Sequence, residues 1–219
     1  MLKYIINLLF PPRCIFCRSI INIENRTDVC DLCYKKIPFA NKIIRPEAGQ
    51  YFDRAICVCE YSGIIKEAII RYKFFNKQYY HKAFALLLAG KIRKMTTDSN
   101  FDIIISVPLH RSKLALRGYN QSLLISKTVS KEIGLEEKSY TLSRIKQTES
   151  QSTLPKSERL SNVGNAFKVL KPHEINGKKI LLVDDVLTTG NTLSECSRVL
   201  KESGAVEVVA AVIASGKKY

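Results

Sequence analysis

The stretch "ILLVDDVLTTGNTL", residues 180–193, decides the fold class of this chain. It begins with a continuous run of large apolar residues, which is typical of a strand that is buried on both faces of a parallel sheet. The run leads into Asp184 and Asp185, and the turn that follows is rich in hydroxyl and amide side chains. Because ligands bind at the carboxyl ends of the strands in such sheets, we expect a binding site at this turn.

The turn itself has the composition of a phosphate-binding loop. It leads into a predicted helix, whose first backbone N–H groups are unpaired and lie at the positive end of the helix dipole. A glycine permits a turn conformation or a close approach that a side chain would block. The sequence contains neither a Walker loop nor a dinucleotide fingerprint at this point. The residues predicted to cradle a phosphate are Thr188, Thr189, Gly190, Asn191 and Thr192.

The carboxylates of Asp184 and Asp185 would repel each other if neither had a partner. Hydroxyl groups of a ligand, a cation or Mg²⁺ would relieve that repulsion. We therefore predict that the stretch holds a phosphorylated polyol, with the two aspartates on its hydroxyl groups. The alternative is a capped turn with two solvated aspartates.

The rest of the chain alternates between patterns typical of strands and patterns typical of helices. This order predicts an α/β fold with a doubly wound, mostly parallel sheet. A polar segment at 144–162 has no sustained apolar period, and we expect it to be functional or mobile. The predicted strands are 52–63 (with a turn), 101–109, 178–186 and 206–215, and the predicted helices are 64–75, 79–95, 118–135 and 192–205.

Four of the seven cysteines form two Cys-x2-Cys pairs with twelve residues between them. Two such pairs suit four thiolates around one structural zinc ion, which would supply much of the stability of a small module. A closed all-cysteine site leaves no open position for catalysis, and the alternative is a set of free buried thiols. The other three cysteines are interpreted as core residues. The predicted ligands are Cys14, Cys17, Cys30 and Cys33, in a zinc module at 1–48 that a linker at 45–50 joins to a second domain at 49–219.

The chain is strongly basic, with 35 Lys and Arg residues against 20 Asp and Glu and a net charge of +15. Such an excess raises the affinity for nucleic acid or phosphorylated metabolites. Between 61 and 100, eight basic residues are mixed with Tyr72, Phe74, Phe75, Tyr79 and Tyr80. This mixture is typical of a groove for single-stranded nucleic acid. The alternative is a solvated basic helix face whose aromatic side chains lie in the core.

The start of the chain does not have the pattern of a targeting signal. Its apolar run is short, one lysine precedes the run and no small-residue cleavage site follows, so we interpret it as a short amphipathic helix. No apolar run in the chain reaches the roughly 20 residues that a membrane-spanning helix needs. We therefore expect the protein in the cytoplasm.

The stretch "LLVDDVLTTGNTL" (181–193) resembles the ligand-binding motif of the type I phosphoribosyltransferases. The resemblance implies that Asp184 and Asp185 take the ribose hydroxyl groups of phosphoribosyl pyrophosphate and that 188–192 take its 5′-phosphate. It also implies that the turn with Val107, Pro108 and Leu109 contacts pyrophosphate. The candidates for basic partners of pyrophosphate are Lys113, Arg117, Arg144, Lys146 and Arg159.

The reaction of that family releases pyrophosphate from C1 of the ribose as a nucleophile arrives. The transition state is cation-like at C1, and Mg²⁺ and basic residues stabilise the departing charge. Asp184 and Asp185 are the candidate catalytic residues because they would orient the ribose and favour positive charge nearby.

Two further stretches resemble a narrower family. "PPRCIFC" (11–17) and "VPLHRSKLALRGYNQSLLIS" (107–126) are similar to the zinc module and the signature of the ComF competence-protein family. The resemblance implies a role in natural transformation, with single-stranded DNA and proteins of the DNA-uptake machinery as partners. The segment 144–167 resembles the flexible loop of the glutamine amidophosphoribosyltransferases, but we expect no complete amidotransferase because their nucleophilic cysteine domain is missing here.

Three hypotheses for the function follow. The first is a ComF-type factor that handles single-stranded DNA and uses the ribose-phosphate site as a ligand pocket. The second is an active, Mg²⁺-dependent phosphoribosyltransferase that acts on an unidentified acceptor. The third is a zinc adaptor for protein partners, with the sheet as a scaffold.

Overall fold

The computed structural model describes residues 10–40, 43–95, 101–146 and 165–216. Within these residues, six strands form one sheet in the order β1-β2-β8-β7-β3-β4. All neighbouring strands pair in parallel except β1, which is antiparallel to β2. The predicted doubly wound, mostly parallel sheet is therefore confirmed. The strands are β1 (Ile43–Ile44), β2 (Arg54–Glu60), β3 (Ile103–Ser106), β4 (Glu136–Glu137), β7 (Lys179–Leu187) and β8 (Glu207–Ser215).

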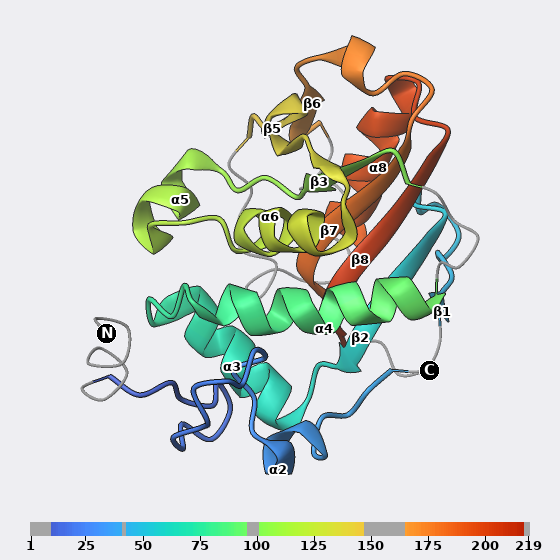
Figure 1. Ribbon diagram of the computed structural model, residues 1–219. Helices are drawn as coiled ribbons and strands as arrows, with labels where there is room; N and C mark the ends of the chain where they lie inside the picture. Colours follow the sequence, from blue (N-terminus) through green and yellow to red (C-terminus); the bar gives the residue numbers. More distant parts are fainter. Residues whose placement is uncertain (1–9, 41–42, 96–100, 147–164, 217–219) are drawn as a thin grey trace.

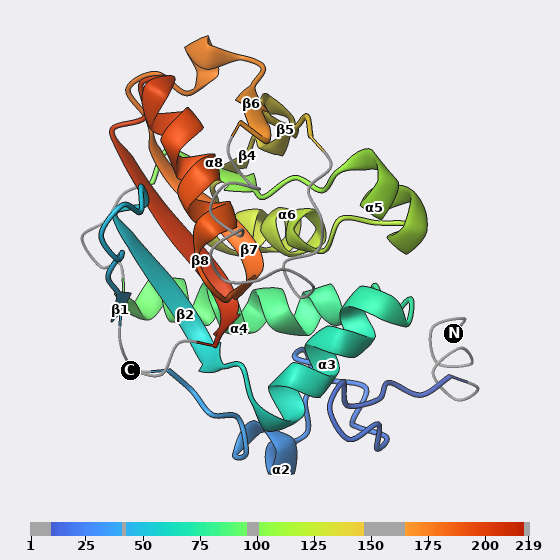
Figure 2. The ribbon, with the colours of Figure 1, turned by 180° about the vertical axis from the view of Figure 1, so that it is seen from behind.

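Helices cover both faces of the sheet. On one face lie α4 (Tyr80–Met95) and α6 (Gln121–Ile133), and on the other lies α8 (Asn191–Glu202), which is in front in Figure 2. The helix α3 (Gly63–Phe74) lies beyond the ends of the strands and shares an apolar cluster with α4 and α6. Alternate side chains of β7 enter two separate apolar clusters, with Leu181 and Val183 in one and Ile180 and Leu182 in the other. Burial on both faces explains why the sequence of β7 is a continuous apolar run.

Several short elements lie outside the predicted pattern. Besides β1, β4 and a helical turn in the N-terminal module, these include the helix α5 (Arg111–Arg117) and a separate two-stranded antiparallel sheet of β5 (Leu142–Arg144) and β6 (Phe167–Val169). Two 3-10 turns, η1 (Ser139–Thr141) and η2 (Pro172–Glu174), flank this small sheet. The predicted polar loop therefore begins in β5, and its residues 147–164 lie outside the described part of the chain.

The N-terminal module lies at the far end of the molecule from β5 and β6 (Figure 1). Its described residues contain one helical turn, α2 (Asp31–Tyr34), and its Ile15, Phe16 and Val29 belong to the same apolar cluster as α3 and α4. The module therefore shares its core with the main body. The predicted boundary at residue 48 stays a prediction, although β1 already pairs with β2 before that point.

The three cysteines outside the two pairs, Cys57, Cys59 and Cys196, are fully buried, as predicted. The predicted N-terminal amphipathic helix falls mainly on residues 1–9, which lie outside the described residues. Among the helices of the described ranges, none is both long and apolar enough to pass through a membrane.

Candidate functional site

Asp184 and Asp185 lie near the carboxyl end of β7, and their side chains have different surroundings. Ser122 Oγ donates a hydrogen bond to Asp184 Oδ1 at 2.7 Å, and the backbone N–H of Asp185 donates to the same oxygen at 2.9 Å. Asp185 is only 7% exposed, and its Oδ1 lies 2.8 Å from Lys73 Nζ. The two carboxylates are thus held by α6 on one side and by α3 on the other.

The helix α6 places Ser122 beside Asp184 for a local reason. The side chain of Asn120 accepts hydrogen bonds from the backbone N–H groups of Ser122 and Leu123, which caps the first turn of α6. The Nδ2 of Asn120 also donates to the carbonyl of Val107 at 3.1 Å. One side chain therefore fixes both the start of α6 and the turn after β3.

The acidic pair carries an electrostatic conflict. Burial and the neighbouring carboxylate of Asp185 raise the pKa of Asp184 to about 7, against the hydrogen bond from Ser122 and the charge of Lys73. Near neutral pH, a proton on Asp184 therefore competes with any ligand group that needs its ionised carboxylate. A ligand that donates hydroxyl groups to the pair would favour the ionised form.

The predicted phosphate cradle forms one cavity with the first of the two aspartates. Asp184 lines it together with Thr188, Thr189, Gly190, Asn191 and Thr192. The helix α8 begins at Asn191, so the first backbone N–H groups of a helix lie at this cavity. The structure thus brings these six predicted residues together.

Gln50 is a residue of this site that the sequence did not reveal. Its Nε2 donates to the carbonyl of Thr189 at 2.8 Å, and its Oε1 accepts from the backbone N–H of Glu47 at 3.0 Å. Gly190 has a φ of +86°, and a Cβ at that position would lie 2.6 Å from Gln50 Nε2. The segment 45–50, interpreted as a linker, therefore also holds the cradle in its left-handed turn.

The turn after β3 is fixed against β7, but its side chains line a different cavity. The backbone N–H of Val107 donates to the carbonyl of Val183 at 2.9 Å. Pro108 and Leu109 line a cavity of about 490 Å³, whose other walls come from α5, α6 and the segment after β4. Neither lines the cradle cavity, so their predicted contact with pyrophosphate stays a prediction.

A group of basic side chains lies near the acidic pair. Burial, followed by the charges of Arg144, Arg117 and Lys73, lowers the pKa of Lys113. Burial also lowers the pKa of Arg144, which the nearby charge of Asp184 partly offsets. Arg117 is held in place, with its guanidinium 5.0 Å from the centre of the Phe74 ring. Three of the five predicted basic residues thus lie close together, next to Lys73, which was not predicted as a site residue. Of the other two, Lys146 is exposed and Arg159 lies outside the described residues.

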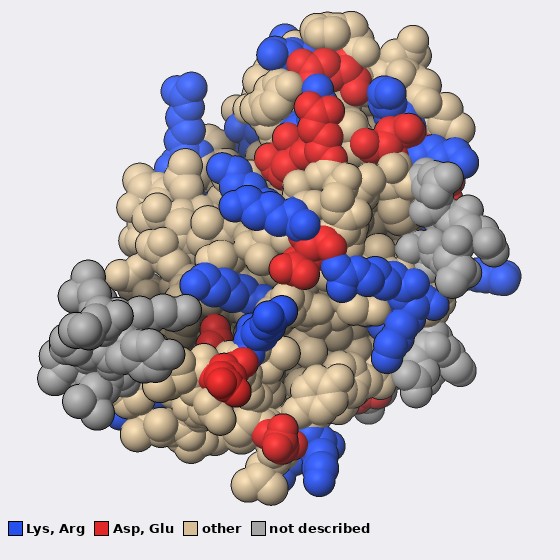
Figure 3. Space-filling view, in the orientation of Figure 1, with Lys and Arg blue, Asp and Glu red and all other residues tan. Residues whose placement is uncertain are grey.

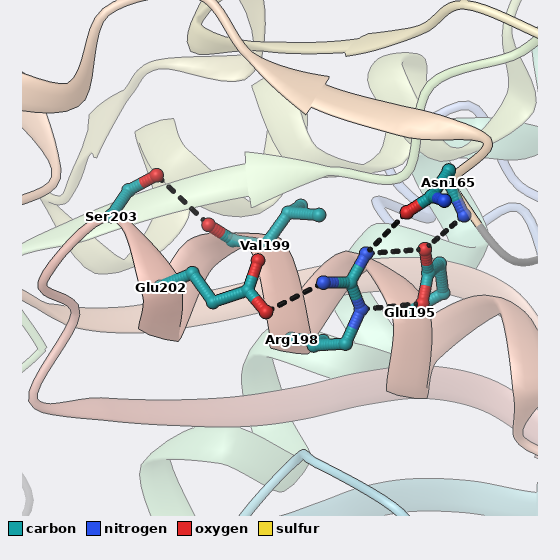
Figure 4. A network of polar contacts seen from close by, with 6 residues as sticks. All are labelled: Asn165, Glu195, Arg198, Val199, Glu202 and Ser203. Atoms are coloured by element: carbon teal, nitrogen blue, oxygen red, sulfur yellow. Dashed lines mark hydrogen bonds and ion pairs between the residues drawn. The ribbon is translucent and has the colours of Figure 1, made fainter.

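The chain re-enters the described structure at residue 165, beside α8 (Figure 4). Glu195 Oε1 accepts a hydrogen bond from the backbone N–H of Asn165 at 2.7 Å. Arg198 donates to both carboxylate oxygens of Glu195 and pairs with Glu202 at 2.6 Å. This network fixes the point from which β6 starts, next to the helix whose first turn forms the cradle.

The four predicted zinc ligands form one cluster. The sulfur atoms of Cys14, Cys17, Cys30 and Cys33 all lie within 4.8 Å of one another, and those of Cys17 and Cys30 are 3.7 Å apart. Sulfur atoms at the corners of a tetrahedron around zinc lie roughly 3.8 Å apart, given a Zn–S distance of about 2.3 Å. The donor set and its spacing therefore fit a structural zinc ion.

Comparison with known proteins supports the predicted identity of both parts of the chain, the zinc module and the phosphoribosyltransferase-like domain. The family model described as phosphoribosyl transferase domain matches residues 78–219, and the one described as double zinc ribbon domain matches residues 5–61. The second match extends beyond the predicted boundary at residue 48. Together with the cysteine cluster, it supports the predicted structural zinc.

Two relatives match most of the length of the chain. The chain is 29% identical to competence protein F of Haemophilus influenzae over 217 residues. The alignment covers 90% of this chain and 93% of the relative. The chain is 30% identical to the DNA utilization protein YhgH of Shigella flexneri over 200 residues, or 87% and 86% of the two chains. A solved glutamine phosphoribosylpyrophosphate amidotransferase from B. subtilis matches 65% of this chain and 30% of its own, with a TM-score of 0.42 and 17% identity. The chain therefore belongs to the phosphoribosyl transferase domain family, with an N-terminal double zinc ribbon and with competence protein F and YhgH among its relatives.

Proposed function

We propose that the acidic pair and the cradle bind the ribose 5-phosphate part of phosphoribosyl pyrophosphate. One observation carries this proposal: Asp184 and the residues 188–192 line a single cavity at the start of α8. The 5′-phosphate accepts hydrogen bonds from the backbone N–H groups and hydroxyls of the cradle. Asp184 and Asp185 accept hydrogen bonds from the ribose hydroxyl groups.

The pyrophosphate part extends from the cradle toward the basic group. Lys113, Arg117 and Arg144 supply positive charge there, and the turn at 107–109 supplies backbone contacts. Mg²⁺ binds through one or two carboxylates and substrate phosphates, so the two aspartates fit it as oxygen donors. When bound, Mg²⁺ would neutralise part of the phosphate charge.

If the chain catalyses transfer, the bond between C1 of the ribose and the pyrophosphate oxygen breaks as an acceptor attacks C1. The electron pair leaves with pyrophosphate, whose charge the three cations stabilise. The acidic pair orients the ribose and stabilises positive charge near C1. Alternatively, the same site binds its ligand without turnover. An acceptor that reacts with the bound ligand would distinguish a transferase from such a ligand pocket.

The biological role that we propose is the handling of single-stranded DNA during DNA uptake in the cytoplasm, together with proteins of the uptake machinery. The names of the relatives, competence protein F and DNA utilization protein, support it. Of the aromatic residues at 72–80, Tyr72 and Tyr80 are buried, but Phe74, Phe75 and Tyr79 are exposed. Lys and Arg side chains also form a band over α4 and α6 (Figure 3).

Calorimetric titration of the purified protein with phosphoribosyl pyrophosphate and Mg²⁺ tests the site. We expect binding by the wild type and its loss in the Asp184→Asn, Asp185→Asn double variant. Asp102→Asn is the matched control, because Asp102 is an exposed carboxylate just before β3, at the other end of that strand from the site. No binding by the wild type would overturn the proposal.

Two further measurements separate the roles. Pyrophosphate release in the presence of single-stranded DNA, or of any other acceptor, would identify an active transferase. The affinity for single-stranded DNA should fall steeply as salt rises, because phosphate contacts release counterions. An affinity that stays flat from low to high salt would contradict the electrostatic model of DNA binding.

A further inference from the structure

We propose that a groove between the N-terminal module and the α3–α4 connection binds single-stranded nucleic acid. The inference rests on the DNA-handling part of the proposed function and adds the place and the contacts. The groove encloses about 640 Å³. We call it the module groove; the lining residues on which the argument depends are Arg13, Arg18, Arg71, Phe75, Lys77 and Tyr79.

The charge of the module groove is strongly positive. Glu67 is the one acidic residue among the described residues that line it, and it lies 3.6 Å from Arg71. Arg13, Arg18 and Lys77 have no carboxylate within ion-pair distance in the described part of the chain. These three cations are therefore available for phosphate groups.

The groove is held in shape by a contact between its two walls. Arg71 Nη2 donates to the carbonyls of Ile15 and Phe16 at 3.0 and 3.1 Å, which ties α3 to the zinc-binding loop. Arg13 Nη1 donates to the carbonyl of Arg18 at 3.2 Å, so both arginines belong to the same turn. The cations thus lie on ordered backbone, which lowers the entropy lost when a ligand binds.

Two aromatic side chains lie among these cations. Phe75 is 62% exposed and Tyr79 is 47% exposed. The Tyr79 ring packs edge-on against the buried ring of Tyr80, with 4.9 Å between the ring centres, and this contact restrains the position of Tyr79. Exposed rings next to cations provide stacking surfaces for bases beside phosphate contacts.

This combination favours a single strand over other polyanions. In a duplex the bases are stacked inside, so Phe75 and Tyr79 would have no base to stack on. An anionic metabolite would use the cations but not both rings. A single-stranded polynucleotide uses both kinds of side chain at the same time.

Fluorescence anisotropy with a labelled oligo-dT of 20 nucleotides tests the groove over a range of salt concentrations. We expect Phe75→Leu with Tyr79→Leu to lower the affinity at least tenfold, in line with base stacking on aromatic side chains. We expect Arg18→Gln with Lys77→Gln to reduce the salt slope by about 1.4, since each lost phosphate contact removes about 0.7. Zinc content and thermal unfolding confirm that each variant is folded.

The controls make the same changes elsewhere. Lys127→Gln with Lys131→Gln removes two exposed cations from α6, and Tyr51→Leu removes an exposed ring that does not line the groove. Tyr51→Leu should bind oligo-dT like the wild type. The α6 variant tests the basic band over α4 and α6, and it should lose less affinity than the groove variants. If the α6 variant loses affinity and the groove variants do not, the strand runs over α6 and the groove proposal is overturned, while DNA handling stands. If the wild type does not bind oligo-dT at all, DNA handling fails and the groove proposal with it.

Discussion

Lys73 Nζ lies 2.8 Å from Asp185 Oδ1, which joins the last turn of α3 to the carboxyl end of β7. Lys73 stands outside both family matches, which cover residues 5–61 and 78–219. The residues before it make contacts in other directions: Arg71 binds the N-terminal module, and Tyr72 Oη donates to the carbonyl of Gln121 at 2.8 Å. Three consecutive residues of α3 thus connect the zinc module, α6 and the acidic pair.

The first prediction follows from this ion pair. Lys73→Met removes the cation from two neighbouring carboxylates, so their mutual repulsion is left uncompensated. We expect the free energy of unfolding to fall by roughly 1–3 kcal/mol, between the values for exposed and buried pairs. Urea unfolding at pH 8 measures this change. Lys73→Arg keeps the charge and should retain most of the stability, and an equal loss in both variants would show that packing, not charge, is responsible.

The second prediction concerns the raised pKa of Asp184. Its pKa is about 7 in the folded chain against 3.8 as the ordinary value, so the folded state binds this proton more tightly than the unfolded state. The contribution to stability is therefore fully present below about pH 4 and is lost as the pH rises through about 7. Asp184→Asn cannot ionise, so we expect it to gain stability over the wild type at pH 8, with the gain shrinking toward pH 4. Urea unfolding at several pH values checks this, with Asp102→Asn as the control; a gain that does not vary with pH would contradict it.

The sequence predicted the parts of the site that depend on local pattern. The strand β7 was predictable because burial on both faces gives an unbroken apolar run, and the cradle because its residues are contiguous. The helix α5 could not be predicted in this way, because none of its residues is buried and its sequence therefore has no apolar periodicity. Lys73 and Gln50 were missed because they reach Asp185 and Thr189 across more than a hundred residues, which leaves no local signal.

The third prediction concerns the close approach of Gly190 and Gln50. In Gly190→Ala the new methyl group meets Gln50 Nε2, and the residue must also adopt a φ of +86°. We expect a loss of about 1–2 kcal/mol in stability and a weaker affinity for the ribose 5-phosphate ligand. Gln50→Ala removes the clash at the cost of about 1 kcal/mol for its hydrogen bond to Thr189.

The double variant Gln50→Ala, Gly190→Ala tests whether the contact is responsible. Because the two residues touch, we expect the double variant to lose less stability than the sum of the two single variants. Additive losses would show that backbone strain alone explains the cost of Gly190→Ala. Thermal unfolding with and without ligand measures all four corners of this cycle.

The fourth prediction concerns removal of the zinc ion. The module shares an apolar cluster with α3 and α4, and Arg71 bonds to the carbonyls of Ile15 and Phe16. Loss of the metal should therefore destabilise α3 as well as the module, because metal ligation is coupled to folding. We expect one zinc per chain by atomic emission, and Cys14→Ser with Cys33→Ser to lose it together with part of the protection of α3 against hydrogen exchange. The control variant Cys196→Ala changes a buried cysteine in the other apolar cluster, and the protein should still bind one zinc ion. Full protection of α3 in the zinc-free protein would show that the module and the main body fold independently.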